Sequence, residues 1–216
     1  MAQNKTLKKV SKKKEQNKKQ KEQDKALRNI FIFLVVVILG FLAVFIIINL
    51  SNSFSYNGVN FYSDKTAMQG RTLYRTSFPV YKEGEKIADY NFYLRTNPNE
   101  LKNIPFNGNL TMKKITVLNP NGELNCDGDG MIAVGNIVQN LYSYLNISVI
   151  RDENATCDDL GRYSLINIEV SDVTEINQIG NSCYEIKVAN CEILKATERY
   201  MIEAFVNINE ALKKNN

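Results

Sequence analysis

The chain has 216 residues, of which 44% are hydrophobic and 23% charged, a composition close to that of an average globular protein. Its net charge of +4 is unevenly spread: residues 1–28 carry eleven basic and three acidic side chains, residues 29–50 carry none, and the remainder carries 16 basic and 20 acidic ones. The basic total is therefore no sign that the folded part binds nucleic acid. The absence of histidine excludes Ser-His-Asp and Cys-His catalytic sites, and the chain has neither a P-loop nor a G-x-G-x-x-G motif.

Residues 1–28 form a tail rich in Lys, Gln and Asn, with too few apolar side chains for a core. We expect it to be disordered and cytoplasmic. Near a membrane such a tail attracts anionic lipid head groups, at about 1 kcal/mol per basic residue. Binding to cytoplasmic nucleic acid is the alternative, but no aromatic side chain stands among the lysines to stack on bases. We therefore expect anionic lipid, and no nucleic acid, as the partner of the tail.

Residues 29–50 predict a single transmembrane helix. The run 30–48 has no charged side chain, and its nineteen residues span about 28 Å as a helix, close to a hydrocarbon core of about 30 Å. A cleaved signal peptide is one alternative, although its apolar part would be shorter and would end in a small-residue site. A pilin-type leader is another, since Lys25-Ala26 precedes the run. Because basic residues concentrate before the helix, we expect a cytoplasmic N-terminus and an extracytoplasmic C-terminal domain at the cell membrane.

Four cysteines follow the apolar run, at Cys126, Cys157, Cys183 and Cys191. An even number outside the cytoplasm predicts two disulfides, whereas zinc would favour close C-x₂-C pairs and histidine; free thiols are the third possibility. Cys126 precedes a predicted helix, and Cys157 follows the strand that returns from it, so we expect these two to pair. Cys183 would then pair with Cys191. That pair requires a bend, because a straight strand between them would exceed the roughly 7 Å that a disulfide allows between Cα atoms.

The same region carries three N-x-S/T sequons, at Asn109, Asn146 and Asn154. They predict a glycoprotein if the host glycosylates asparagine. A fourth sequon, at Asn49, adjoins the predicted membrane span, where we expect it to be inaccessible.

The first half of the outer domain predicts antiparallel sheet. Asn57-Gly58 separates two short apolar runs, and Lys-Glu-Gly-Glu at 82–85 separates the runs 71–81 and 87–95; both patterns are typical of hairpins. In the last run apolar and polar residues alternate, which indicates one buried face; its apolar members are Ala88, Tyr90, Phe92 and Leu94. We expect a further strand over 111–118, ended by Asn-Pro-Asn-Gly at 119–122.

The second half adds helices. Spacings of three and four predict an amphipathic helix that begins after Asp129 as N-cap, with its apolar face at Met131, Val134, Val138, Leu141 and Leu145. Short strands are expected over 147–151, 163–170 and 184–188. A final helix over 196–214 has an apolar face made of Leu194, Met201, Ala204, Phe205, Ile208 and Leu212. The fold class is therefore α+β, with residues 51–216 forming one extracytoplasmic domain that contains an antiparallel sheet and two amphipathic helices.

One stretch resembles the start of a calcium loop. Asn125, Asp127 and Asp129 stand at positions 1, 3 and 5, and Gly130 stands at position 6. Position 12, where such loops need a bidentate Glu, is Asn136. A turn followed by a helix cap is the alternative interpretation, and we otherwise expect no metal and no cofactor.

Acidic side chains at two further places are candidates for a site. Asp152, Glu153, Asp158 and Asp159 surround Cys157, and Glu198 lies in the last helix. Paired carboxylates perform acid–base chemistry when they are buried and their pKa values are pushed apart. We expect the first group to be an ordinary solvated loop and Glu198 to lie on an exposed helix start.

Several segments taken together resemble membrane-anchored surface proteins of small-genome archaea for which no activity is known. These segments are Ser-Phe-Pro-Val at 77–80, Asn-Phe-Tyr-Leu-Arg-Thr-Asn-Pro at 91–98, Cys-Asp-Gly-Asp-Gly at 126–130, Glu-Asn-Ala-Thr-Cys at 153–157 and Cys-Glu-Ile-Leu-Lys-Ala-Thr-Glu-Arg at 191–199. The resemblance implies an archaeal cell surface. It implies no catalytic or binding residue.

The hypothesis we favour is a non-enzymatic surface domain that binds a partner protein or an envelope component. One alternative is an anchored enzyme that acts on envelope material, with Asp127, Asp129 or Glu198 in a cleft. Another is a component of a secretion or pilus-like assembly. A deep pocket lined by those carboxylates would favour the enzyme, and an exposed apolar surface would favour the binding domain.

Overall fold

The computed structural model describes residues 28, 31–46, 53–68, 70–122 and 124–214. The chain divides into two compact units, Met1–Asn52 and Ser53–Asn216. In the first, residues 31–46 are helical and expose their large apolar side chains. Within the described ranges, no helix is long and apolar enough to cross a membrane. The predicted basic tail, apart from Arg28, and both ends of the predicted span lie outside the described residues.

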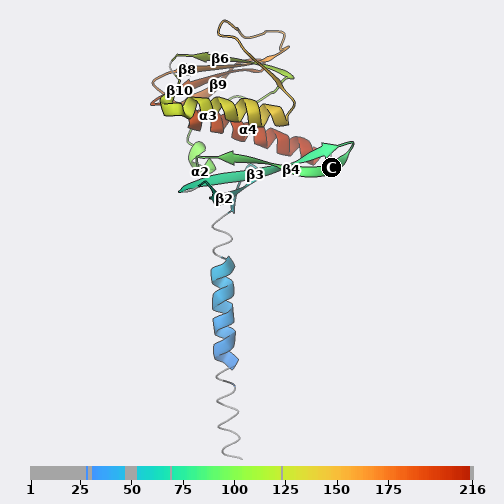
Figure 1. Cartoon of the computed structure of the whole chain (residues 1–216), viewed down its shortest axis with the longest axis vertical. Coiled ribbons are helices and arrows are strands. Elements are labelled where there is room, and N and C mark those ends of the chain that lie inside the picture. The colour runs from blue at the N-terminus through green and yellow to red at the C-terminus, as the bar shows by residue number, and fades with distance from the viewer. Residues whose placement is uncertain (1–27, 29–30, 47–52, 69, 123, 215–216) are drawn as a thin grey trace, which may run out of the picture. The chain divides into compact units, whose positions relative to one another are not determined.

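The second unit contains two sheets, and the helices α3 and α4 lie in the layer between them (Figure 1). The elements in chain order are β1 (Ser53–Tyr56), β2 (Val59–Met68), β3 (Arg71–Lys82), β4 (Glu85–Leu94), α2 (Pro98–Leu101), β5 (Phe106–Asn107), β6 (Ile115–Asn121), η1 (Cys126–Gly128), α3 (Asp129–Gly135), η2 (Asn136–Tyr142), β7 (Ser148–Arg151), β8 (Ser164–Val170), β9 (Glu175–Gly180), β10 (Cys183–Val188) and α4 (Ile193–Lys214). One large cluster of buried side chains draws on both sheets and both helices. The predicted α+β class is confirmed.

The first sheet is an antiparallel meander in the order β1-β2-β3-β4. Asn57-Gly58 and Glu83-Gly84 make its two-residue turns, and all four residues have positive φ, as type I′ turns require. Both predicted hairpins are therefore confirmed. Phe92 and Leu94 are buried as predicted, but Ala88 is exposed, because the far end of the β3–β4 hairpin carries exposed residues on both faces.

The second sheet has the order β5-β9-β10-β8-β6-β7, and only the β9–β10 pair is antiparallel. The predicted strand over 111–118 instead runs from Ile115 to Asn121 and passes through Pro120. Proline is tolerated there because pairing with β7 ends at Leu118, which leaves β6 as a free edge on that side. The sequence analysis missed β5 and β9 and did not foresee the parallel pairing.

The outer face of this sheet carries a row of polar side chains. Five side chains from neighbouring strands stand in register across it, namely Asn107, Asn177, Glu185, Asn167 and Asn119. The side-chain amide of Asn107 donates to Asn177 at 2.7 Å, and that of Asn121 donates to Asn167 at 2.9 Å. At the other end of the same face, Val117, Leu165 and Cys183 form a buried apolar cluster, covered by Ala155, Cys157 and Tyr163 of the segment after β7.

The helix after β6 departs from its prediction in two ways. Gly128, with φ of 92°, occupies the N-cap position in place of Asp129, which is the first helical residue. The face turned to the core is made of Ala133, Ile137, Leu141 and Tyr142. The predicted face is offset by one position along most of its length, so Met131 is 75% exposed. Both stripes are apolar, and the π-helical turn η2 brings them together at Leu141.

The last helix, α4, is confirmed, although it begins at Ile193 rather than at 196. Its predicted apolar face is buried except for Leu212, which is half-buried. Because α4 lies between two sheets (Figure 1), it buries Glu198, which the sequence placed on an exposed helix start, and also Arg199.

All four cysteines form disulfides, as predicted, but with different partners. Cys126 pairs with Cys191 and Cys157 pairs with Cys183, with Cα–Cα distances of 5.4 and 5.8 Å. The predicted pairs are wrong because β7 runs parallel to β6, so the segment that follows β7 packs at Cys183 rather than at Cys126. Two disulfides are typical of an extracellular or secreted domain.

Candidate functional site

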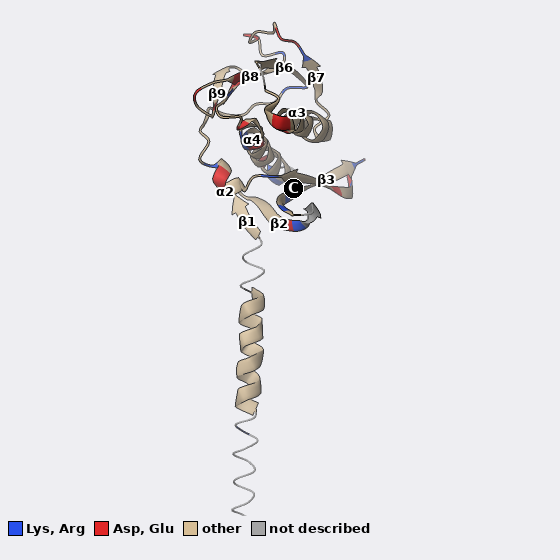
Figure 2. Cartoon of the chain, turned by 60° about the vertical axis from the view of Figure 1, so that its left-hand side comes forward, with Lys and Arg blue, Asp and Glu red and all other residues tan. Residues whose placement is uncertain are grey.

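A groove of about 640 Å³ lies where β6 ends and α3 begins. Its lining is mostly apolar and consists of Leu118, Pro120, Gly122, Leu124, Asn125, Gly130, Met131, Val134, Gly135, Val138, Gln139, Arg151 and Ile193. The labels of β6, β7 and α3 locate it in Figure 2. Ligand pockets usually measure about 300–1,000 Å³ and combine an apolar wall with a few polar groups. This groove has that composition.

The topology of the mixed sheet explains why a groove forms here. From β6 the chain passes through α3 and η2 to β7 on one side, while β8 pairs with the other side of β6 and leads on to β9 and β10. Adjacent parallel strands whose connections leave in opposite directions open a crevice at their carboxyl ends, where ligands of α/β folds bind. Leu118, Pro120 and Gly122 place the groove at that end of β6.

The offset apolar stripe of the helix supplies one wall. Met131, Val134 and Val138, which the sequence assigned to the core, line the groove, and the two valines also pack against the core cluster. Met131 is mostly exposed, and the two valines are half-buried. The exposed part of this stripe, above all Met131, is available to a ligand.

Two glycines shape the same wall in different ways. A Cβ atom added to Gly130 would collide with the carbonyl oxygen of Leu124, so only glycine allows the chain to approach the helix so closely. A Cβ atom added to Gly135 would meet nothing within 4 Å. Gly135 therefore leaves space in the groove without being needed for packing.

Arg151 is the one charged side chain among the described residues that line the groove. It ends the edge strand β7 and stands in register with Leu118, so it lies on the helix-covered side of the sheet. Its guanidinium donates to the Glu153 carboxylate at 3.0 Å, with side chains 69% and 63% exposed. Ion pairs this exposed contribute little stability and are readily exchanged.

The calcium candidate becomes a tight turn. The carbonyl oxygen of Asn125 accepts backbone N–H bonds from Gly128 and Gly130, at 2.9 and 3.1 Å, and the chain continues directly into α3. Among the residues that the structure describes, no three His, Cys, Asp or Glu side chains are grouped to hold a metal ion. Asn125 lines the groove, whereas Asp127 is exposed and Asp129 is half-buried.

Glu198 is fully buried and joins α4 to the end of β4. Its carboxylate accepts the backbone N–H groups of Arg95 and Thr96, at 2.6 and 2.9 Å. Burial raises the pKa of Glu198, and the hydrogen bonds from Thr96 and Arg95 offset only part of that shift. Both carboxylate oxygens are occupied by backbone, so the arrangement is structural.

Arg199, the next residue, is almost as deeply buried. Its guanidinium forms an ion pair with Glu203 and donates from Nε to the carbonyl oxygen of Ile104 at 3.1 Å. Tyr56 also donates to Glu203, at 3.2 Å, so this network ties β1 to α4.

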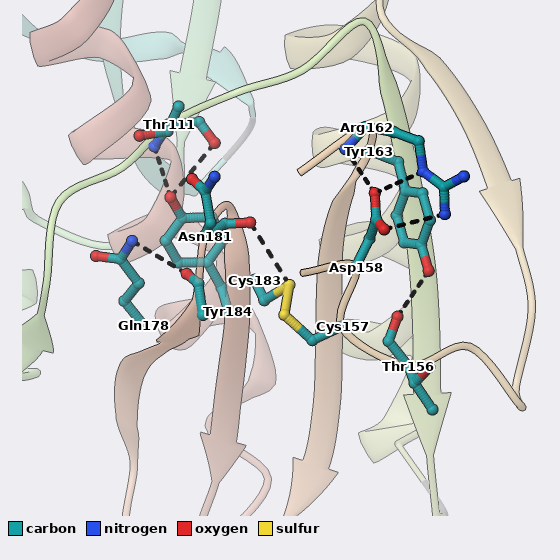
Figure 3. The surroundings of a disulfide bond; sticks show 11 residues. Thr111, Thr156, Cys157, Asp158, Arg162, Tyr163, Gln178, Asn181, Cys183 and Tyr184 are labelled. Atoms are coloured by element: carbon teal, nitrogen blue, oxygen red, sulfur yellow. Dashed lines mark hydrogen bonds and ion pairs between the residues drawn. A yellow bond between two sulfur atoms is a disulfide. The ribbon is translucent and has the colours of Figure 1, made fainter. Parts of the chain in front are cut away.

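The carboxylates around Cys157 have separate local roles, and Figure 3 shows the contacts of Asp158. Asp158 accepts two bonds from the Arg162 guanidinium, both at 3.1 Å, and one from its backbone N–H. These side-chain and backbone bonds lower the pKa of Asp158. Asp152 accepts the backbone N–H of Asn154 at 2.9 Å. No pair of these carboxylates shares a hydrogen bond that would suit acid–base chemistry.

The three sequon asparagines, Asn109, Asn146 and Asn154, are all exposed. Glycosylation at these positions stays a prediction. The sequon at Asn49 lies outside the described residues.

A second, smaller hollow of about 490 Å³ lies at the base of the β3–β4 hairpin. Tyr81, Tyr90, Tyr144 and Leu212 are among its lining residues. Its described lining has no charged side chain and no group of polar side chains lying close together. The groove at β6 is therefore the stronger candidate site.

The groove was not predicted, because it depends on how β6, α3 and β7 are arranged together and not on any one strand. A strand, a helix and a strand within 115–151 is the pattern of a parallel crossover unit, and that signal would have placed Pro120 and Arg151 at one edge. Comparisons with family models, curated proteins and solved structures found no match to the chain.

Proposed function

We propose that this protein is a single-pass, membrane-anchored extracytoplasmic binding domain, and that the apolar part of its ligand lies in the groove between β6 and α3. The observation that carries the proposal is the lining of the groove: it is apolar, and none of its described members is acidic. An enzyme that relies on carboxylates would need such groups to converge on a pocket. Asp127 and Glu198 instead lie on different elements, one exposed and one buried against backbone.

The compartment is supported by two features. Both disulfides suit an oxidising environment. The uncharged run 30–48, preceded by eleven basic residues, suits a membrane span with the N-terminus inside. In this proposal the basic tail contacts anionic lipids, and exposed sequons accept glycans where the host provides them.

Alkylation of the full-length chain in its membrane tests the compartment. We expect an impermeant thiol reagent to add nothing before reduction and four groups after it, as measured by intact mass. Proteases added to intact cells should remove the domain and leave the basic tail protected. If no group is added even after reduction, or if the tail is cleaved first, the proposed location is wrong.

Photo-crosslinking tests the groove. The probe is dodecanol with a diazirine in its chain, added to the full-length protein in nanodiscs of zwitterionic lipid. We expect the labelled peptides to come from residues 118–139. Mass spectrometry identifies the labelled residues, so probe that is dissolved in the lipid does not affect the result. Gly135→Phe should fill the groove and abolish this labelling, because the space beside Gly135 is open. Glu210→Phe, which adds the same bulk to an exposed position of α4, is the matched control and should leave labelling unchanged.

Labelling spread evenly over the domain would contradict the proposal. So would labelling of 118–139 that persists in the Gly135→Phe variant. Thermal unfolding of both variants verifies that they are folded. Replacement of Gly135 should not lower stability, because glycine is unfavourable inside a helix and the space beside it is open.

A further inference from the structure

We infer that the groove binds a single-chain lipid anion, with the apolar chain against the α3 wall and the acidic head on Arg151. This inference rests on the proposed function, since it names the class of ligand for the same groove. The argument depends on the position of Arg151, the weakness of its present partner and the chemistry of the lining.

Arg151 occupies a position that register alone would assign to an apolar side chain. On the helix-covered side of the sheet its neighbours across β6 and β8 are Leu118 and Ile166, both buried. A guanidinium at such a place sits at the mouth of an apolar groove. Its long aliphatic stem follows the apolar surface while the charged end reaches water.

The Glu153 carboxylate is a replaceable partner. The pair is two residues apart in a loop, joined by one bond of 3.0 Å between strongly exposed side chains. A ligand carboxylate on the same guanidinium would form two parallel bonds, the geometry that favours arginine over lysine. Binding therefore gains a stronger bond than it loses.

The charge and polarity of the lining select the kind of ligand. The described lining has one cation and no anion, and its neutral polar members are Asn125 and Gln139. Leu118 adjoins Arg151 in register, and Leu124 and Ile193 are further apolar members of the lining. One positive group at the end of an otherwise apolar surface is complementary to one negative head on an alkyl chain. A domain tethered to a bilayer also meets such molecules at high local concentration.

The alternative role of Arg151 is to protect the edge strand. A charged side chain that points inward on an edge strand prevents pairing with another chain. In that case Arg151 would not discriminate between ligands, and its replacement would promote self-association. The two roles therefore predict different measurements.

The experiment compares two diazirine probes of equal chain length, dodecanoate and dodecanol, on the full-length protein in zwitterionic nanodiscs. We expect half-maximal labelling of residues 118–139 to require about tenfold less dodecanoate than dodecanol. One charge-assisted hydrogen bond contributes a difference in affinity of about this size. Arg151→Gln should reduce the ratio to about one while dodecanol labelling persists, and Arg151→Lys should give an intermediate ratio, since an ammonium lacks the paired geometry. Lys195→Gln, a basic residue of α4 outside the groove lining, is the control and should keep the tenfold ratio.

Equal labelling by both probes in the wild type would overturn this inference and leave the proposed function standing. Labelling by neither probe would overturn both. A tenfold ratio that survives Arg151→Gln would show that Arg151 is not the recognition group. If an apolar peptide with a free carboxyl terminus displaces the probe at lower concentration than dodecanoate does, the ligand is a peptide and the assignment to a lipid is wrong.

Discussion

The two sheets of the outer domain are built on opposite principles. The meander β1–β4 pairs only consecutive strands, and two of its connections are two-residue turns. The mixed sheet places β6 between β7 and β8 and sets β5 beside β9, so most of its neighbouring strands are distant in sequence; β9 and β10, joined by a short turn, are the exception. Both disulfides belong to the second region: one joins the turn before α3 to the turn before α4, and the other joins the loop after β7 to β10.

This difference indicates which region of the domain depends on disulfide crosslinks for its stability. Pairing of strands that are distant in sequence requires long loops to close before stabilising contacts form, and this closure costs conformational entropy. Local hairpins avoid that cost, and the meander has no crosslink among its described residues. The groove and its arginine lie in the region that depends on the crosslinks, so changes in the mixed sheet should affect binding more than changes in the meander.

The largest expected effect comes from removing a disulfide. Replacing Cys126 and Cys191 by alanine opens a loop of 65 residues, and replacing Cys157 and Cys183 opens one of 26. We expect the unfolding free energy to fall by about 4 kcal/mol in the first variant and about 3.5 kcal/mol in the second, because loop entropy grows slowly with length. Urea unfolding followed by tyrosine fluorescence measures both. A greater loss in the second variant would contradict the entropic explanation.

Replacing Glu198 tests the junction between α4 and the meander. Glu198→Ala leaves the N–H groups of Arg95 and Thr96 buried without an acceptor, so we expect a loss of about 3 kcal/mol in unfolding free energy. Glu198→Gln keeps one acceptor and should lose about half as much. The control is Glu210→Gln, an exposed position of the same helix, which should change little.

The same carboxyl group predicts a pH dependence. Burial raises the pKa of Glu198 in the folded state above its unfolded value, so the folded protein binds the proton more tightly. The contribution of Glu198 to stability is therefore fully present below the ordinary Glu pKa and is lost as the pH rises through the raised value. The difference in unfolding free energy between wild type and Glu198→Gln should shrink as pH rises. A difference that grows with pH would show that the backbone bonds outweigh burial.

Two glycines of one helix should respond in opposite directions. Gly130→Ala collides with the Leu124 carbonyl and should lower stability by about 1–3 kcal/mol. Gly135→Ala enters open space and should raise it by about 0.5–1 kcal/mol, the gain expected for glycine in a helix. Thermal unfolding of the two variants side by side makes each the control for the other. Equal effects would mean that the wall of the groove is not packed as described.

The smallest effect belongs to the polar outer face. Asn107→Ala removes the 2.7 Å side-chain bond to Asn177 between the exposed edges of β5 and β9. Cross-strand pairs of this kind contribute about 0.2–1 kcal/mol, so we expect a loss of about 0.5 kcal/mol. Hydrogen exchange at Ile176, whose N–H bonds to the Pro105 carbonyl at 2.9 Å, reports whether β5 loosens. A loss above about 2 kcal/mol would show that this face does more than remain solvated.

Local patterns predicted the elements that depend on neighbours in sequence. Asn57-Gly58 and Glu83-Gly84 specify turns through positive φ, and the alternation up to Leu94 specifies a buried face. The buried face of α4 was also predicted, because apolar residues spaced three and four apart lie on one side of a helix. Alternation failed at Ala88 because a pattern does not reveal where the core ends.

By itself the sequence determined the fold class, the two hairpins of the first sheet, the final helix and the presence of two disulfides, because each follows from periodicity, turn chemistry or an even cysteine count. Only the tertiary structure decided the strand order of the mixed sheet and therefore which cysteines pair. It also decided which of two apolar stripes on one helix is fully buried and which, half-buried or exposed, lines a groove with Arg151. The physical reason is that both stripes satisfy the helical period equally, and parallel pairing depends on contacts between residues far apart in the chain.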